Sequence, residues 1–219
     1  MKIENQPLHA KPEQKKNQIL SVAIAFFVIS LFITIVNLQS FSIVPLWLNI
    51  SFVILLIGSI GHFGYGLFIS KKLGNWNKIG YFILVYLMLI SIQLLLTSNT
   101  MYIVGVEDGQ INEEVNYLTL TLLLYIAVFI ILCFCSFIIS SPQWRQVSSG
   151  KAYVMGSIIA IGIIVLIMTG LVLYRESAFI NPDSVKSAYQ FFLGAVLALF
   201  PATELGVSMT RAKLGGSKR

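Results

Sequence analysis

The sequence predicts an all-α integral membrane protein, built as a bundle of six transmembrane helices. Of its 219 residues, 57% are hydrophobic and only 11% are charged, and the mean hydropathy is +0.84. A soluble domain carries about a quarter charged residues. Several apolar runs reach the roughly 20 residues that a helix needs to cross the hydrocarbon layer. No run shows sustained period-two alternation, so helices are the expected way to satisfy the backbone in lipid.

Six apolar segments mark the expected helices. The first run, Ile19 to Val36, is longer than the apolar region of a usual signal peptide, and no A-x-A cleavage motif follows it, so we expect it to remain in the protein. Pro45 suits the first turn of the second helix, where its missing N–H needs no partner. The motif "NPD" at 181–183 predicts a turn before the sixth helix. The expected spans are 19–38, 45–70, 79–98, 118–140, 153–174 and 188–209.

The predicted transmembrane domain, residues 19–209, has short polar flanks. The arm 1–18 contains two prolines and mixed charge, and we expect it to be disordered or to lie along the cytoplasmic face. The longest predicted loop, 99–117, carries four carboxylates without the ligand spacing of a calcium loop, so it is interpreted as a solvated acidic loop. The tail 210–219 is basic.

The distribution of charge predicts the orientation of the chain. Thirteen of the fifteen basic residues lie in the arm, in the loops 71–78 and 141–152, and in the tail. Six of the nine acidic residues lie on the opposite side. The basic side is cytoplasmic by the positive-inside rule, which places both termini inside the cell. The net charge of +6 is therefore a topology signal, and nucleic acid is not an expected partner.

Two ionisable residues at membrane depth are the first candidates for a site, because such residues are costly in lipid and are often functional. His62 on the second span and Glu204 on the sixth lie at similar predicted depths, and Pro201 is expected to kink the helix just before Glu204. If the two helices are neighbours, the pair would respond to protonation. Two simpler interpretations stay open: Glu204 extends toward Arg211 at the interface, and His62 bonds a hydroxyl or carbonyl on an adjacent helix.

Small residues recur at every fourth position on two spans, a spacing that aligns them on one helix face. Such faces allow neighbouring helices in membranes to approach closely. The second span has Gly58 and Gly66 on either side of His62, and the sixth span has Gly194, Ala198, Ala202 and Gly206. Both sets are predicted helix contacts. Asn49 and Gln93, in the outer half of their spans, are interpreted as interhelical hydrogen-bonding groups.

Motifs for catalysis or cofactor binding are not found in the sequence. The only histidines are His9 and His62, which is too few for a metalloprotease motif or for bis-histidine haem ligation within the bundle. Cys133 and Cys135 have a C-x-C spacing that suits neither a redox pair nor a shared metal, and they are interpreted as small apolar side chains. We therefore expect no enzyme activity and no cofactor.

Two functions remain open from the sequence. The first, which is slightly favoured, is a membrane subunit that forms or borders a path for a small solute, ion or lipid. The second is a non-transporting accessory, assembly, immunity or regulatory protein that packs against a larger membrane complex. The expected location is the plasma or inner membrane. The expected surroundings are the lipid bilayer, with a second copy of the chain or a larger complex left open as a partner.

Overall fold

The computed structural model of the chain describes residues 12–71, 76–109, 117–139, 162 and 182–216, and this part of the chain is helical apart from short connections. Five of its helices contain a segment long and apolar enough to cross a membrane. This architecture is consistent with a helical membrane bundle. The helices are α1 (Pro12–Leu38), α2 (Leu46–Lys71), α3 (Trp76–Glu107), α4 (Tyr117–Ile139) and α7 (Pro182–Gly216).

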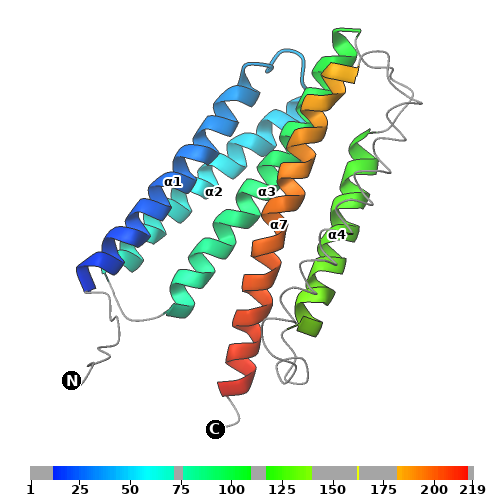
Figure 1. Cartoon of the computed structure of the whole chain (residues 1–219). Coiled ribbons are helices and arrows are strands. Elements are labelled where there is room, and N and C mark those ends of the chain that lie inside the picture. Colours follow the sequence, from blue (N-terminus) through cyan, green and yellow to red (C-terminus); the bar gives the residue numbers. More distant parts are fainter. Residues whose placement is uncertain (1–11, 72–75, 110–116, 140–161, 163–181, 217–219) are drawn as a thin grey trace, which may run out of the picture.

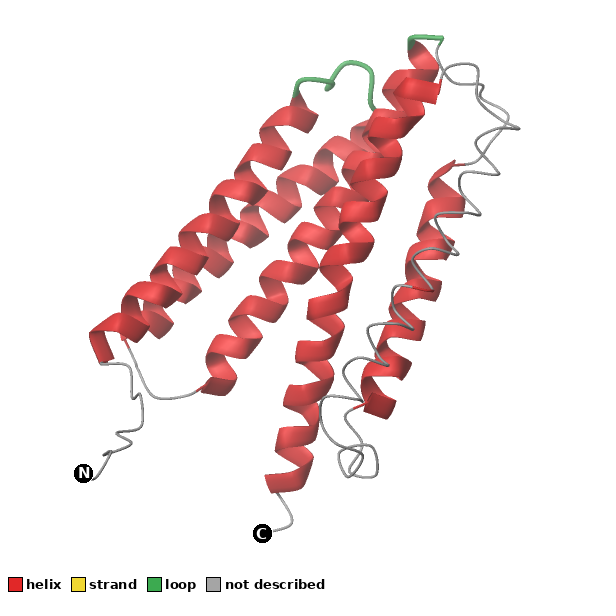
Figure 2. Ribbon diagram, viewed as in Figure 1, coloured by secondary structure: helices red, strands yellow, loops and turns green. Residues whose placement is uncertain are grey.

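Helix α3 lies at the centre of the described bundle (Figure 1). It packs against α1 and α2 on one side and against α7 and α4 on the other, and its contact with α7 is the most extensive in this part of the structure. Helix α1 also packs on α2, and α4 packs on α7. The start of α1 and the end of α7 lie at the same end of the bundle, as the ribbon view also shows (Figure 2).

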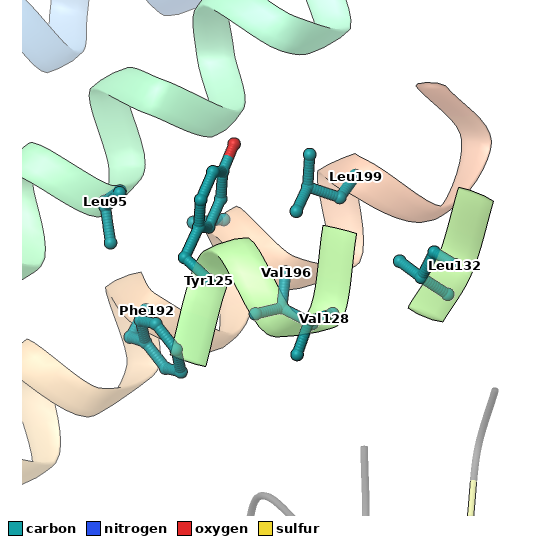
Figure 3. Close-up of a cluster of buried hydrophobic side chains, with 8 residues drawn as sticks. Leu95, Tyr125, Val128, Leu132, Phe192, Val196 and Leu199 are labelled. Atoms are coloured by element: carbon teal, nitrogen blue, oxygen red, sulfur yellow. The ribbon is translucent and has the colours of Figure 1, made fainter. Parts of the chain in front are cut away.

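The apolar core is divided between the two sides of α3. On one side, side chains from α1, α2 and α3 form a cluster that includes Ile33, Phe52 and Ile90. On the other side, α3, α4 and α7 contribute Leu95, Tyr125, Val128, Leu132, Phe192, Ala195, Val196 and Leu199 (Figure 3). Many large apolar side chains of α1, α2 and α4 are exposed, as lipid-facing helices require.

Helix α3 is longer than the sequence predicts, and the predicted loop 99–117 is wrong over its first part. Residues 99–107 are helical, so α3 ends at Glu107. Residues 97–100 are polar, but Asn99 and Thr100 donate hydrogen bonds to the carbonyls of Leu95 and Leu96 one turn earlier. These bonds satisfy the side chains without interrupting the helix. Gly109, at a φ of 68°, ends the helical segment.

The other boundaries differ by smaller amounts. Helix α1 includes residues 12–18 of the predicted arm. Helix α7 begins at Pro182, within the motif that predicted a turn, and continues through Pro201 into the tail as far as Gly216. The predicted fifth span, 153–174, lies outside the described residues apart from Gly162, as do the arm before Pro12 and the loop 141–152.

Candidate functional site

A buried contact between polar side chains joins α1 to α3 near the middle of the membrane-spanning region. The Gln93 side-chain amide donates hydrogen bonds to Ser30 Oγ at 2.8 Å and to Thr34 Oγ1 at 3.4 Å. Ser30 and Thr34 follow each other at i, i+4 on α1, so both face the same stripe of α3. Gln93, for which the sequence indicates an interhelical contact, thus bonds two hydroxyls of the neighbouring helix.

A second amide, that of Asn37 on α1, extends this contact by one turn along α3. Asn37 donates from its Nδ2 to Thr97 Oγ1 at 2.9 Å and to the Ile33 carbonyl of its own helix at 2.7 Å. Thr97 donates in turn to the Gln93 carbonyl at 2.8 Å. We call this continuous group the polar seam; its five members, all buried, are Ser30, Thr34, Asn37, Gln93 and Thr97.

The polar seam has two acceptors without a donor. Each amide group has two N–H hydrogens, and both Asn37 and Gln93 donate to two acceptors. Their carbonyl oxygens, Asn37 Oδ1 and Gln93 Oε1, have no hydrogen-bond partner among the described residues. The residues are 1% and 0% exposed, respectively. An unpaired buried acceptor costs about 1–3 kcal/mol, so these oxygens mark the seam as a place that a ligand or water can satisfy.

The opposite face of α3 carries separate polar contacts to α4 and α7. Ser91 donates to the Ala195 carbonyl of α7 at 2.7 Å, so the Tyr125 hydroxyl of α4, also at 2.7 Å, must donate to Ser91. Figure 3 shows that hydroxyl directed toward α3. Nearer the end of the helix, Asn99 donates to Thr121 Oγ1 of α4 at 3.4 Å, and Thr121 donates to the Tyr117 carbonyl of its own helix at 2.8 Å. These contacts hold α4 and α7 against α3.

His62 is bonded to α3 and lies among aromatic rings. Its Nε2 lies 2.8 Å from the Phe82 carbonyl oxygen, and because a carbonyl only accepts, Nε2 carries the hydrogen. The imidazole stacks on the Phe82 ring with centroids 4.6 Å apart and meets the Tyr86 ring edge-on at 4.6 Å. The contact corresponds to one role that the sequence left open, a bond to a carbonyl on an adjacent helix.

The glycines beside His62 differ in what they contact. A Cβ atom at Gly66 would lie 2.5 Å from Phe82 Cε2, so the Phe82 ring occupies the space that Gly66 leaves. At Gly58, the same atom would lie 3.9 Å from a Leu89 methyl group, which is ordinary packing. Gly66 is therefore the position that makes room for the His62–Phe82 stack, and Gly58 is much less constrained.

Two of the predicted small residues of α7, Gly194 and Gly206, face side chains of α3. A Cβ at Gly194 would lie 3.4 Å from Leu94 Cδ1, and one at Gly206 would lie 3.7 Å from both Leu84 methyl groups. Ala202 is fully buried and Ala198 is partly buried on the same helix. This stripe belongs to the extensive contact between α3 and α7.

Glu204 is not brought to His62. Glu204 is exposed on α7, whereas His62 contacts α3, the helix on which both α2 and α7 pack. No ion pair joins the two residues, both of which are described. The predicted proton-responsive pair therefore has no support in the geometry, because it assumed that α2 and α7 are neighbours. Asn49 also differs from the expectation: its amide bonds the carbonyls of Phe41 and Val44 in the α1–α2 connection, at 3.2 Å each.

Most of the polar seam was missed from the sequence. Single serine, threonine and asparagine residues in apolar runs are common and carry no motif. The signal that points to them is their spacing: Ser30, Thr34 and Asn37 fall on one face of α1, and Gln93 and Thr97 fall on one face of α3. Within the described residues, no group of three or more histidine, cysteine or acidic side chains is placed to hold a metal ion, and both cysteines are free.

Comparisons with known proteins do not assign the chain to a group: no protein-family model, no curated protein and no solved structure matches it.

Proposed function

We propose that the chain is a membrane subunit that forms or borders a path for a small polar solute or ion, and that the polar seam between α1 and α3 is the part that contacts this solute. The observation that carries the proposal is the pair of unpartnered carbonyl oxygens, Asn37 Oδ1 and Gln93 Oε1, buried between two apolar helices. Polar groups at membrane depth that are not fully used by packing are typical of solute pathways.

The depth of the seam supports this proposal. The α1 span runs from Leu20 to Leu38, so Ser30 lies one residue from its middle. Asn37 lies eight residues from the middle residue of that span, or about 12 Å along the helix at 1.5 Å per residue. The seam therefore extends from the membrane midplane toward the end at which α1 meets α2. A path from that side to the midplane would be lined by uncharged oxygen atoms.

We also propose six spans with both termini in the cytoplasm of a cell whose plasma or inner membrane holds the protein. Helix α4 ends and α7 begins at opposite ends of the bundle (Figure 1). The apolar run 153–174 in the sequence is long enough to supply the further crossing that six spans require, and this supports the proposal. The basic residues at the shared end of α1 and α7 support the cytoplasmic assignment. The proposal includes no catalytic reaction.

Substituted-cysteine labelling tests the path. Ser30→Cys and Thr34→Cys are made in a background in which Cys133 and Cys135 are replaced by alanine, and intact cells are treated with a charged, water-soluble thiol reagent. We expect labelling of both positions. The matched control is Ala195→Cys, which is equally buried but lies in the apolar core, and which we expect to stay unlabelled. Protection of both seam positions from either side of the membrane would rule out a water-accessible path.

An accessory role is the second candidate, and Glu204 is the observation that favours it. This carboxylate is exposed in the described structure although it lies within the apolar segment Ser187–Thr210. A basic group on a partner would stabilise it there. Co-purification under mild detergent compares the wild-type chain with Glu204→Gln. If the chain is an accessory subunit, a partner is retained by the wild-type protein and lost from Glu204→Gln; no partner in either case contradicts this role.

A further inference from the structure

We propose that the polar seam is a binding site for a monovalent cation of the sodium or potassium class. This inference rests on the proposed function and narrows its solute to one chemical class. The five oxygen atoms that can contribute are two side-chain carbonyls and three hydroxyls, all buried between α1 and α3; they belong to Asn37, Gln93, Ser30, Thr34 and Thr97.

The hydrogen bonds of the seam leave more acceptors than donors for a ligand. The four amide hydrogens of Asn37 and Gln93 all go to protein oxygens. Thr34 donates its hydroxyl hydrogen to the Ser30 carbonyl at 2.9 Å, and Thr97 donates to the Gln93 carbonyl. What remains is two free carbonyl oxygens, the spare lone pairs of the hydroxyls, and the Ser30 hydroxyl hydrogen, which has no acceptor among the described hydrogen bonds. Because the oxygen acceptors outnumber this single donor, the seam favours a cation or another hydrogen-bond donor over an anion.

The charge and chemistry of the ligands favour a monovalent cation. All five side chains are neutral, and the carboxylates on the described spans, Glu107 and Glu204, are not members of the seam. Divalent calcium and magnesium are usually held with the help of one or more carboxylates. Neutral carbonyl oxygens are the ligands that replace the hydration shell of monovalent ions in channel filters. The seam presents two of these, Asn37 Oδ1 on α1 and Gln93 Oε1 on α3, and it also contains three hydroxyls.

The first measurement uses the wild-type full-length chain in detergent. Its thermal unfolding is followed in sodium, potassium or lithium chloride from 1 to 100 mM, with N-methylglucamine chloride keeping the ionic strength constant. We expect at least one of the small cations to raise the midpoint by about 5–10 °C at a dissociation constant near 1 mM, because a ligand that binds only the folded state stabilises it. Equal midpoints in all four salts would overturn the proposal.

The second measurement compares two matched asparagines. Asn37 and Asn99 are both buried, and each donates to a carbonyl one turn earlier and to a threonine on a neighbouring helix. They differ in their place: Asn99 bonds Thr121 of α4, away from the seam, whereas Asn37 belongs to the seam and its carbonyl oxygen is unpartnered. We expect Asn37→Leu to raise the dissociation constant of the cation, measured from the shift of the unfolding midpoint, at least tenfold. We expect Asn99→Leu to keep the dissociation constant of the wild-type chain. Equal retention in both variants would contradict the assignment.

A third variant adds charge in place of a carbonyl. Gln93→Glu keeps the length of the side chain and is expected to bind the same cation at least tenfold more tightly at neutral pH, because a carboxylate attracts a cation more strongly than an amide oxygen does. An unchanged or weaker affinity contradicts the proposal. Radioactive sodium binding to the wild-type chain gives the same answer without any variant. Cysteine labelling of the seam with no cation binding would leave the proposed path intact and reject only the cation.

Discussion

Replacement of Gly66 by alanine gives the sharpest test of the packing around His62. The added Cβ would lie 2.5 Å from Phe82 Cε2 and 2.6 Å from Phe82 Cζ. Carbon atoms in contact prefer separations of about 3.5–4.0 Å, so the ring or the helix must move by roughly 1 Å. The Phe82 side chain has little freedom to do so, because it is 1% exposed and packs against both His62 and Tyr86.

The expected magnitude combines two opposing effects. Insertion of a methyl group into a well-packed core typically destabilises a protein by about 1–3 kcal/mol. Alanine in place of glycine inside a helix contributes about 0.5–1 kcal/mol in the opposite direction. Gly61 lies on the same helix and isolates the second effect, since a Cβ at Gly61 would have no neighbouring atom within 4 Å. The free energy of unfolding of Gly66→Ala should therefore lie about 1–3 kcal/mol below that of Gly61→Ala.

Unfolding of the two variants and of the wild-type chain is measured in the same detergent, by heat or by titration with a denaturing detergent. We expect Gly61→Ala to be at least as stable as the wild-type protein and Gly66→Ala to be less stable than both. A stability of Gly66→Ala equal to that of Gly61→Ala would show that α2 and α3 do not pack through this position, and the account of the His62 contact would be wrong.

Three further predictions concern other contacts of α3 and its outer end. Ser91→Ala should lower the free energy of unfolding by about 1–3 kcal/mol in the same assay, because it leaves the buried Tyr125 hydroxyl without its acceptor; no change would show that this junction is not formed. His62→Phe should cost only about 0.5–1.5 kcal/mol, since the ring stack on Phe82 remains and one hydrogen bond is lost; a larger loss would indicate a further role for the imidazole. Asp108→Cys should react with an impermeant thiol reagent in intact cells, and reaction only after permeabilisation would reverse the proposed orientation.

The course of the described helices was predictable because lipid imposes one strong requirement on the chain. Every backbone polar group must be satisfied within the segment, so a long apolar run is nearly sufficient evidence for a helix. The expected span 79–98 stops short of the end of α3 at Glu107. Asn99 and Thr100 lower the hydropathy beyond residue 98, but their side chains bond carbonyls one turn back within the helix. Hydropathy measures transfer from water, not the partners that a polar group finds inside a bundle.

Helix neighbours were not predictable from the sequence, and the candidate site depended on them. The sequence relates His62 and Glu204 by their depth alone, and equal depth places two residues on the same level without placing them on adjacent helices. In the structure, both of their helices pack on α3, and His62 contacts Phe82. The small residues at every fourth position indicate that α2 and α7 have close helix contacts, but their spacing does not identify the helix that packs against them.

The polar residues of α3 follow from its central position. A side chain such as Gln93 is costly against lipid, where it has no partner, but is stabilising between helices that offer hydroxyls and carbonyls. Helix α3 has such neighbours on both sides, with Ser30 and Thr34 of α1 on one and Tyr125 of α4 on the other. A central helix can therefore be rich in neutral polar groups while remaining apolar enough to span. Two oxygens of the seam, Asn37 Oδ1 and Gln93 Oε1, depart from this balance because no described donor bonds them, and this imbalance points to a ligand.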